Sequence, residues 1–193
     1  RRSISAEGIA IAVEKGSGHE QVAVRALFAR FLPEEKRAKR LGTVVRADEI
    51  LKLNGDAAQG RRHFFETEGV QCRNCHRVGG AGRAVGPDLD NIAKNNSPAQ
   101  LLESILEPAK RVDPKFVTYL VETKAGTVHT GLLVKKDADE VVLKDAQDKT
   151  TQIPAGEIEH LSGQSTSLMP ELLVRDLTAQ QLADLIAYLS SLK

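Results

Sequence analysis

The two cysteines of this 193-residue chain fall within five residues, Cys72-Arg73-Asn74-Cys75-His76. Cysteines this close cannot cross-link distant parts of a fold, so the chain is not a disulfide-stabilised scaffold. Two thiols three positions apart can add to the two vinyl groups of one haem, and the histidine that follows can then bind its iron. The segment therefore predicts one covalently attached haem c, with Cys72 and Cys75 as anchors and His76 as an axial ligand.

Other uses of a Cys-x-x-Cys pair fit the surrounding sequence less well. A thioredoxin-like redox pair needs a βαβ context, which is absent here. A zinc site would need another ligand, since Cys72, Cys75 and His76 are too crowded to supply three corners of a tetrahedron easily. Chance occurrence of a five-residue pattern stays open at this level.

The single methionine is the strongest candidate for the second axial ligand. Met169 lies in Ser167-Leu168-Met169-Pro170, just before the last expected helix. A thioether sulfur is a soft, neutral ligand that favours reduced iron. The alternative is a core methionine that fills a gap. Four histidines are weaker candidates, since each fits a surface or hydrogen-bonded role: His19, His63, His129 and His160.

Residues near the attachment segment could support it. The loop Gly86-Pro87-Asp88-Leu89 follows His76, and the Pro87 carbonyl could accept a hydrogen bond from the free ring N–H of His76. Such a bond would fix the tautomer of the histidine and raise its basicity. An ordinary turn is the alternative. Three arginines could pair with haem propionates, form a docking rim or simply be solvated: Arg73, Arg77 and Arg83.

Composition limits the partners and the location. Hydrophobic residues make up 41% of the chain and charged residues 27%, with a formal net charge of +1. This charge gives no case for nucleic acid or an anionic membrane as partner, and no apolar run is long enough to span a bilayer. The first residues lack the apolar stretch of a signal peptide. Because c-type haem is normally attached after export, we expect an upstream signal peptide and a periplasmic or other extracytoplasmic location. Residue 1 is then expected to be the start of a mature chain or of an excised domain.

Hydrophobic spacing and capping residues predict four helices, at 20–31, at 56–68, after Ser97 and after Thr178. A glutamine three residues after each of the three later caps, Asp56 included, completes an expected capping box. Residues 1–18 show no firm pattern, and 34–40 indicate a charged, solvated helix or linker.

Between the third and fourth helices the pattern alternates, with β-branched residues and polar breaks. It predicts five short strands, at 116–123, 127–135, 140–144, 150–153 and 158–161. The expected fold is a mainly α cytochrome c core, α+β overall, with a small antiparallel insertion at about 115–162, between the third helix and Met169. Residues 1–45 are expected to be a helical lead-in or the tail of a preceding domain, and 46–193 the monohaem domain.

The order of these motifs resembles class I cytochrome c, and more closely the haem-binding C-terminal domains of planctomycete and verrucomicrobial proteins. The similarity runs across roughly 40–193 and includes CxxCH, GPDL, LLESIL followed by a proline, a β segment, SLMP and DLIAYL. The resemblance implies thioethers at Cys72 and Cys75, His76 as proximal ligand and Met169 as distal ligand. The chain differs from compact class I members in having a long β-rich segment between the third helix and Met169.

The resemblance also implies a crossing of the first and last core helices. Gly60 would allow their close approach near Tyr188 and Leu189, and Phe64 would pack there.

The expected function is electron transfer by Fe(III)/Fe(II) cycling, with redox proteins as partners. The chain would be a soluble carrier or the acceptor domain of a larger dehydrogenase, and not an enzyme in its own right. The alternative is a haem-based sensor of a gas or of redox state, in which the distal ligand is displaceable. A weak peroxidase would likewise need an open distal position, and a fixed Met169 argues against both.

Overall fold

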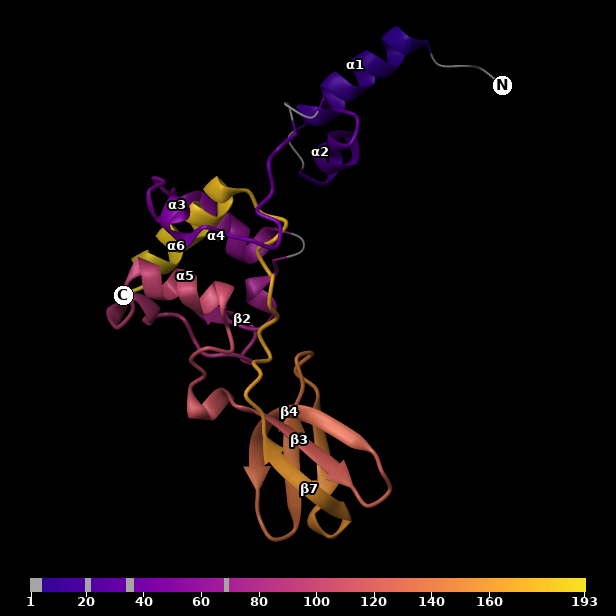
Figure 1. Ribbon diagram of the computed structural model, residues 1–193, viewed down its shortest axis with the longest axis vertical. Coiled ribbons are helices and arrows are strands. Elements are labelled where there is room, and N and C mark those ends of the chain that lie inside the picture. The colour runs from indigo at the N-terminus through magenta and orange to yellow at the C-terminus, as the bar shows by residue number, and fades with distance from the viewer. Residues whose placement is uncertain (1–4, 20–21, 34–36, 68–69) are drawn as a thin grey trace. The chain divides into compact units, whose positions relative to one another are not determined.

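The computed structural model describes residues 5–19, 22–33, 37–67 and 70–193. The chain divides into two compact units, Arg1–Lys39 and Arg40–Lys193 (Figure 1). The functional domain boundary expected after residue 45 stays a prediction.

The first unit contains two helices, α1 (Ala6–Ser17) and α2 (Val22–Ala29). The sequence showed no pattern for α1, yet its start has a clear cause, because the Ser5 hydroxyl accepts the Gly8 N–H at 3.1 Å. The helix expected at 20–31 is confirmed over the range of α2. Residue 20 and residues 34–36 of the expected charged segment lie outside the described residues.

The second unit begins with its helices, α3 (Ala47–Leu51), α4 (Ala57–Glu66), α5 (Pro98–Leu106) and α6 (Ala179–Ser191). Helices α4, α5 and α6 were predicted, and α3 was not. The expected end of α4 at residue 68 lies outside the described residues. Capping boxes at the starts of α5 and α6 are confirmed. None of the described helices is long and apolar enough to cross a bilayer.

The start of α4 differs from the predicted capping box. The Asp56 carboxylate accepts the N–H groups of Ala58 and Gln59, at 2.8 and 3.2 Å. Its own N–H donates to Asp184 in α6, at 2.9 Å, and not to the side chain of Gln59. A long-range carboxylate thus takes the place of the expected local partner.

Helices α4 and α6 cross at very close range, as the resemblance implied. A Cβ atom added to Gly60 would lie 1.9 Å from the Asp184 carbonyl oxygen and 2.7 Å from the Tyr188 Cβ, so only glycine fits. Phe64 is buried beside this crossing, and its ring centre lies 5.8 Å from that of Tyr188, edge to face. The helical core of the unit is built around this contact.

Five antiparallel strands form one sheet, in the order β6-β5-β4-β3-β7 (Figure 1). Their bounds are β3 (Thr118–Thr123), β4 (Val128–Lys136), β5 (Glu140–Lys144), β6 (Thr150–Pro154) and β7 (Ile158–Gly163). The five predicted strands are therefore confirmed within two residues at each end. The last strand returns to pair with the first, since β7 lies beside β3.

The predicted fold class was wrong. The chain is 37% helical and 21% strand, which does not describe a mainly α cytochrome core with a small insertion. The physical reason is that the sheet has an apolar core of its own, separate from the helical one and made of Val121, Val141, Leu143 and Ile153. Alternation along single strands predicted each strand but not the size of the layer that they form together.

Candidate haem-attachment site

The Cys72–His76 segment folds as one tight turn. The 3₁₀ turn η2 (Cys72–Asn74) carries it, and the N–H groups of Cys75 and His76 both donate to the Cys72 carbonyl, at 3.1 and 2.9 Å. Side chains three residues apart are eclipsed in a 3₁₀ turn. The backbone therefore favours an arrangement with the Cys72 and Cys75 side chains on one side of the turn.

A short hairpin follows the turn, where the sequence predicted only a glycine-rich loop. Its strands are β1 (Arg77–Val78) and β2 (Ala81–Gly82), joined by Gly79 and Gly80, whose φ angles are +57° and +78°. Two positive φ values give a type I′ turn, which glycine adopts readily. Gly82 lies so close to the turn that a Cβ there would be 2.2 Å from the His76 carbonyl oxygen.

After the hairpin, the chain returns to the cysteine turn. The Arg83 N–H donates to the Arg73 carbonyl at 2.9 Å. The N–H groups of Val85 and Gly86 both donate to the Cys75 carbonyl, at 3.0 and 2.8 Å. These backbone bonds hold the loop after the hairpin against the turn that contains the two thiols.

The His76 ring lies between this loop and the turn. Its Nδ1 lies 2.9 Å from the Pro87 carbonyl oxygen. Because a carbonyl only accepts, Nδ1 carries the proton and Nε2 keeps its lone pair. Burial lowers the pKa of His76, while the Pro87 bond opposes that shift, so the ring is neutral near pH 7. A Cβ on Gly86 would lie 2.7 Å from the ring Cε1, so glycine is required beside this potential ligand.

The two thiols are free and half-buried. Burial raises the pKa of Cys72 to about 12, and it also raises the pKa of Cys75, where the nearby Arg83 charge acts in the opposite direction. A redox-active cysteine pair needs an accessible thiolate, whereas burial favours the protonated form of both of these thiols. In the described part of the chain, no three His, Cys, Asp or Glu side chains gather as a metal site. Two thiols beside a neutral imidazole fit covalent haem attachment better than zinc or a redox disulfide.

Met169 is half-buried and packs against the helical core, and Cys72 packs against that same core. The Met169 N–H donates to the Ser167 hydroxyl at 3.1 Å, which shapes the loop before α6. The structure thus brings the only methionine to the apolar cluster that the attachment turn also contacts. Its role as an axial ligand stays a prediction.

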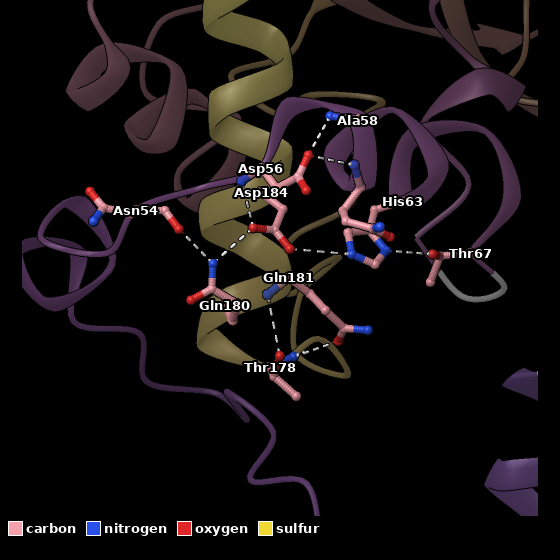
Figure 2. A network of polar contacts seen from close by, with 10 residues as sticks. Asn54, Asp56, Ala58, His63, Thr67, Thr178, Gln180, Gln181 and Asp184 are labelled. Carbon is pink, nitrogen blue, oxygen red and sulfur yellow. Dashed lines mark hydrogen bonds and ion pairs between the residues drawn. The ribbon is translucent and has the colours of Figure 1, made fainter. Parts of the chain in front are cut away.

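The competing histidines have other surroundings. In Figure 2 the His63 ring lies between two partners, with Nδ1 3.0 Å from the Thr67 hydroxyl and Nε2 3.8 Å from the Asp184 carboxylate. Both ring nitrogens therefore have partners that do not belong to the cysteine turn. His129 and His160 belong to β4 and β7 of the sheet, and His19 belongs to the first unit.

A buried carboxylate joins α4 to α6, and sequence reasoning missed it. Asp184 is 6% exposed. One of its oxygens accepts the Asp56 N–H at 2.9 Å and the Gln180 side-chain amide at 2.8 Å, and the other faces His63 (Figure 2). The signal was available, because this aspartate interrupts the apolar stripe Leu182, Leu185 and Ile186 of the last helix.

The turn, the neutral histidine and the two thiols are the groups that would hold a covalently attached haem. Residues 57–143 match the family model of cytochrome c. The matched segment includes α4, the attachment turn, α5 and strands β3 and β4, and it ends before Met169. No curated protein matches the chain. The family match supports a cytochrome c with covalent haem and haem-based electron transfer in general.

Proposed function

We propose that the chain binds one haem c through thioethers to Cys72 and Cys75, with His76 and Met169 as axial ligands, and that it transfers single electrons. The bound haem would supply the reversible one-electron chemistry. The observation that carries the proposal is the contact of His76 Nδ1 with the Pro87 carbonyl beside two protonated thiols.

The protein's own groups would each have a defined task. The Pro87 carbonyl holds the proton on Nδ1 of His76, so Nε2 is the basic nitrogen. Gly86 leaves room for the ring, and Val85 and Leu89 in the same loop are buried. The Met169 thioether would favour the reduced iron and so raise the reduction potential.

Residues 46–193 would form the haem domain, with 1–45 as a lead-in or the tail of a preceding domain. Domains of the cytochrome c family are typically extracytoplasmic, and we propose a periplasmic location here. The motif order from CxxCH to DLIAYL supports a relationship to the C-terminal domains of planctomycete and verrucomicrobial proteins. The chain would act as a soluble carrier, or as the acceptor domain of a larger dehydrogenase, with redox proteins as its partners.

Haem attachment is tested by expressing the chain with a c-type maturation system and a signal peptide. A pyridine haemochrome spectrum should show a c-type haem that resists acid–acetone extraction, and the intact mass should increase by one haem. The Cys72→Ser/Cys75→Ser variant should retain no acid-stable haem. Haem that is extractable from the wild type, or no haem at all, would contradict the proposal.

Axial ligation is tested separately on the haem-loaded protein. The oxidised wild type should show a sulfur-to-iron charge-transfer band that is lost in Met169→Ala. Leu173→Ala is the matched control, since this half-buried side chain packs against the same core without a sulfur. Rapid carbon monoxide binding to the reduced wild type would favour the gas-sensor alternative.

A further inference from the structure

Met169 lies in the segment that joins β7 to α6, residues 164–177. The structure describes every residue of this segment, and none of them belongs to a helix or a strand. The start of the segment is held by the Gln164 N–H, which donates to the Thr118 carbonyl of β3 at 2.7 Å. A side chain in such a segment keeps a defined position only if the far end is held as well.

The far end is held by the chain that enters the second unit. The Leu41 N–H donates to the Leu177 carbonyl at 2.8 Å, and the Gly42 N–H donates to the Arg175 carbonyl at 2.9 Å. The stretch Arg40–Gly42, here named the clasp, therefore ties the start of the unit to the residues just before α6.

Arg40 adds a side-chain contact to the clasp. Its guanidinium donates to the Asp176 carbonyl, and its backbone forms an isolated antiparallel bridge with Thr178, the residue that caps α6. The consecutive carbonyls of Arg175, Asp176 and Leu177 thus all accept hydrogen bonds from the clasp. A run of carbonyls satisfied in this way is fixed in direction as well as in position.

The contacts around the clasp make its position well defined. Val174 and Leu177 are buried, and Leu41 packs against the same helical core. Gly42 turns the chain at this point with a φ of +69°, and a Cβ there would meet no atom within 4 Å. Glycine is therefore needed at this position for its backbone conformation and not for lack of space.

We propose that the clasp positions the distal ligand: by holding the end of the 164–177 segment, it keeps the Met169 thioether on the haem iron. This inference rests on the proposed function. A segment tied at both ends has fewer conformations in which the sulfur lies away from the iron, so the open state is rarely populated. Loss of the clasp would raise that population without changing either Met169 or His76.

Stabilisation of the fold alone is the other role that the clasp could have. The two roles differ in what an added ligand of the iron experiences. Imidazole binds ferric haem only after the iron–sulfur bond breaks, and its nitrogen lone pair then forms the new bond to Fe(III), with no change in oxidation state. Its apparent Kd therefore reports the fraction of molecules in which Met169 is off the iron.

The test is an imidazole titration of the oxidised, haem-loaded full chain, followed by loss of the sulfur-to-iron band. Gly42→Val should bind imidazole about tenfold more tightly than the wild type, because a β-branched residue strains the clasp at a positive φ. Gly42→Asn should remain within about threefold, since asparagine adopts such angles more readily. Arg40→Ala, which removes the contact of an exposed side chain with Asp176, should give about threefold tighter binding.

Gly126→Val is the matched control. Gly126 has a φ of +78° in the β3–β4 turn, and a Cβ there also meets no atom within 4 Å, so the substitution applies the same strain elsewhere in the unit. The imidazole affinity of this variant should remain within about twofold of the wild type. A second control repeats Gly42→Val in the Met169→Ala background, where no thioether competes and the imidazole affinity should not change.

Tighter binding in Gly42→Val that disappears without the Met169 sulfur would support the clasp. Unchanged affinity in both Gly42→Val and Arg40→Ala, with the wild-type band intact, would overturn the clasp and leave the axial ligation standing. Equal tightening in Gly126→Val, or in the Met169→Ala background, would show that the clasp only stabilises the fold. If the wild type shows no sulfur-to-iron band, the proposed axial ligation itself is refuted, and the clasp with it.

Discussion

The helical part of the second unit and its sheet are stabilised in different ways. The helices meet through a backbone contact at Gly60 and a buried carboxylate, Asp184, that binds groups from two elements. The sheet has a small apolar core and carries its ion pairs on the surface, where Lys135 contacts Asp137 at 2.6 Å and Glu140 at 2.8 Å. Such exposed pairs contribute little to stability.

The difference matters because of where the candidate site lies. The attachment turn and Met169 both pack against the helical core, whose contacts join residues far apart in the sequence. The sheet is built mainly from neighbouring strands joined by short turns. Haem binding should therefore be more sensitive to single changes in the helical core than to changes in the sheet.

The largest effect is expected for Gly60→Ala. Its Cβ would lie 1.9 Å from the Asp184 carbonyl oxygen, which is backbone and cannot move without separating α4 from α6. The free energy of unfolding should fall by about 4 kcal/mol, as measured by urea denaturation followed by circular dichroism. Gly156→Ala is the control, because a Cβ there meets no atom within 4 Å. Similar stability of the two variants would show that the crossing is not close-packed.

The sequence predicted local features better than long-range ones. The caps at Ser97 and Thr178 and the alternation of the strands could be recognised, because each depends on residues that are close in the chain. The Cys72–His76 segment could be named as a candidate site since thioether chemistry requires that spacing.

Contacts made by the fold were not visible in the same way. The packing of Gly86 on the His76 ring and the bond from Asp56 to Asp184 join segments whose proximity no local pattern reveals. The predicted fold class was wrong for a related reason. The number of predicted strands does not show that the sheet they form has an apolar core of its own.

The sheet core is tested by Leu143→Ala. Leu143 is 2% exposed, and its truncation should cost about 3 kcal/mol of unfolding free energy through lost burial and a cavity. We expect the covalent haem and the sulfur-to-iron band to persist, because Leu143 belongs to the core cluster of the sheet. The solvent-exposed Val134→Ala is the control. Loss of the band in Leu143→Ala would show that the two cores are coupled.

A smaller loss is expected for Asp184→Asn. The substitution keeps one acceptor oxygen for the Asp56 N–H but removes the charge, and it places an amide donor toward Gln180 or His63. Unfolding free energy should fall by about 2 kcal/mol, since hydrogen bonds to charged groups are among the stronger ones. Asp176→Asn, at an exposed aspartate before α6, is the matched control. Equal stability of both variants would mean that the buried carboxylate is not a stabilising link.

The smallest effect is a pH dependence that originates at His63. Burial lowers the pKa of His63 below its ordinary value of 6.5, and the nearby Asp184 only partly opposes that shift. The folded state therefore binds a proton less readily than the unfolded state. The stability contributed by neutral His63 is complete above about pH 6.5 and is lost as the pH falls below it.

Haem-loaded protein is the appropriate sample for this measurement, because His76 would then be a ligand and would not titrate in the same range. In the wild type, the urea concentration at the unfolding midpoint should decrease as the pH is lowered from about 7.5 to about 5.5. The decrease should be smaller in His63→Gln. His160→Gln, at an exposed position of β7, should retain the wild-type dependence. A steeper dependence in His63→Gln would mean that protonated His63 stabilises the helix crossing through Asp184. The helical core would then be strengthened by acid, in contrast to the expectation from burial.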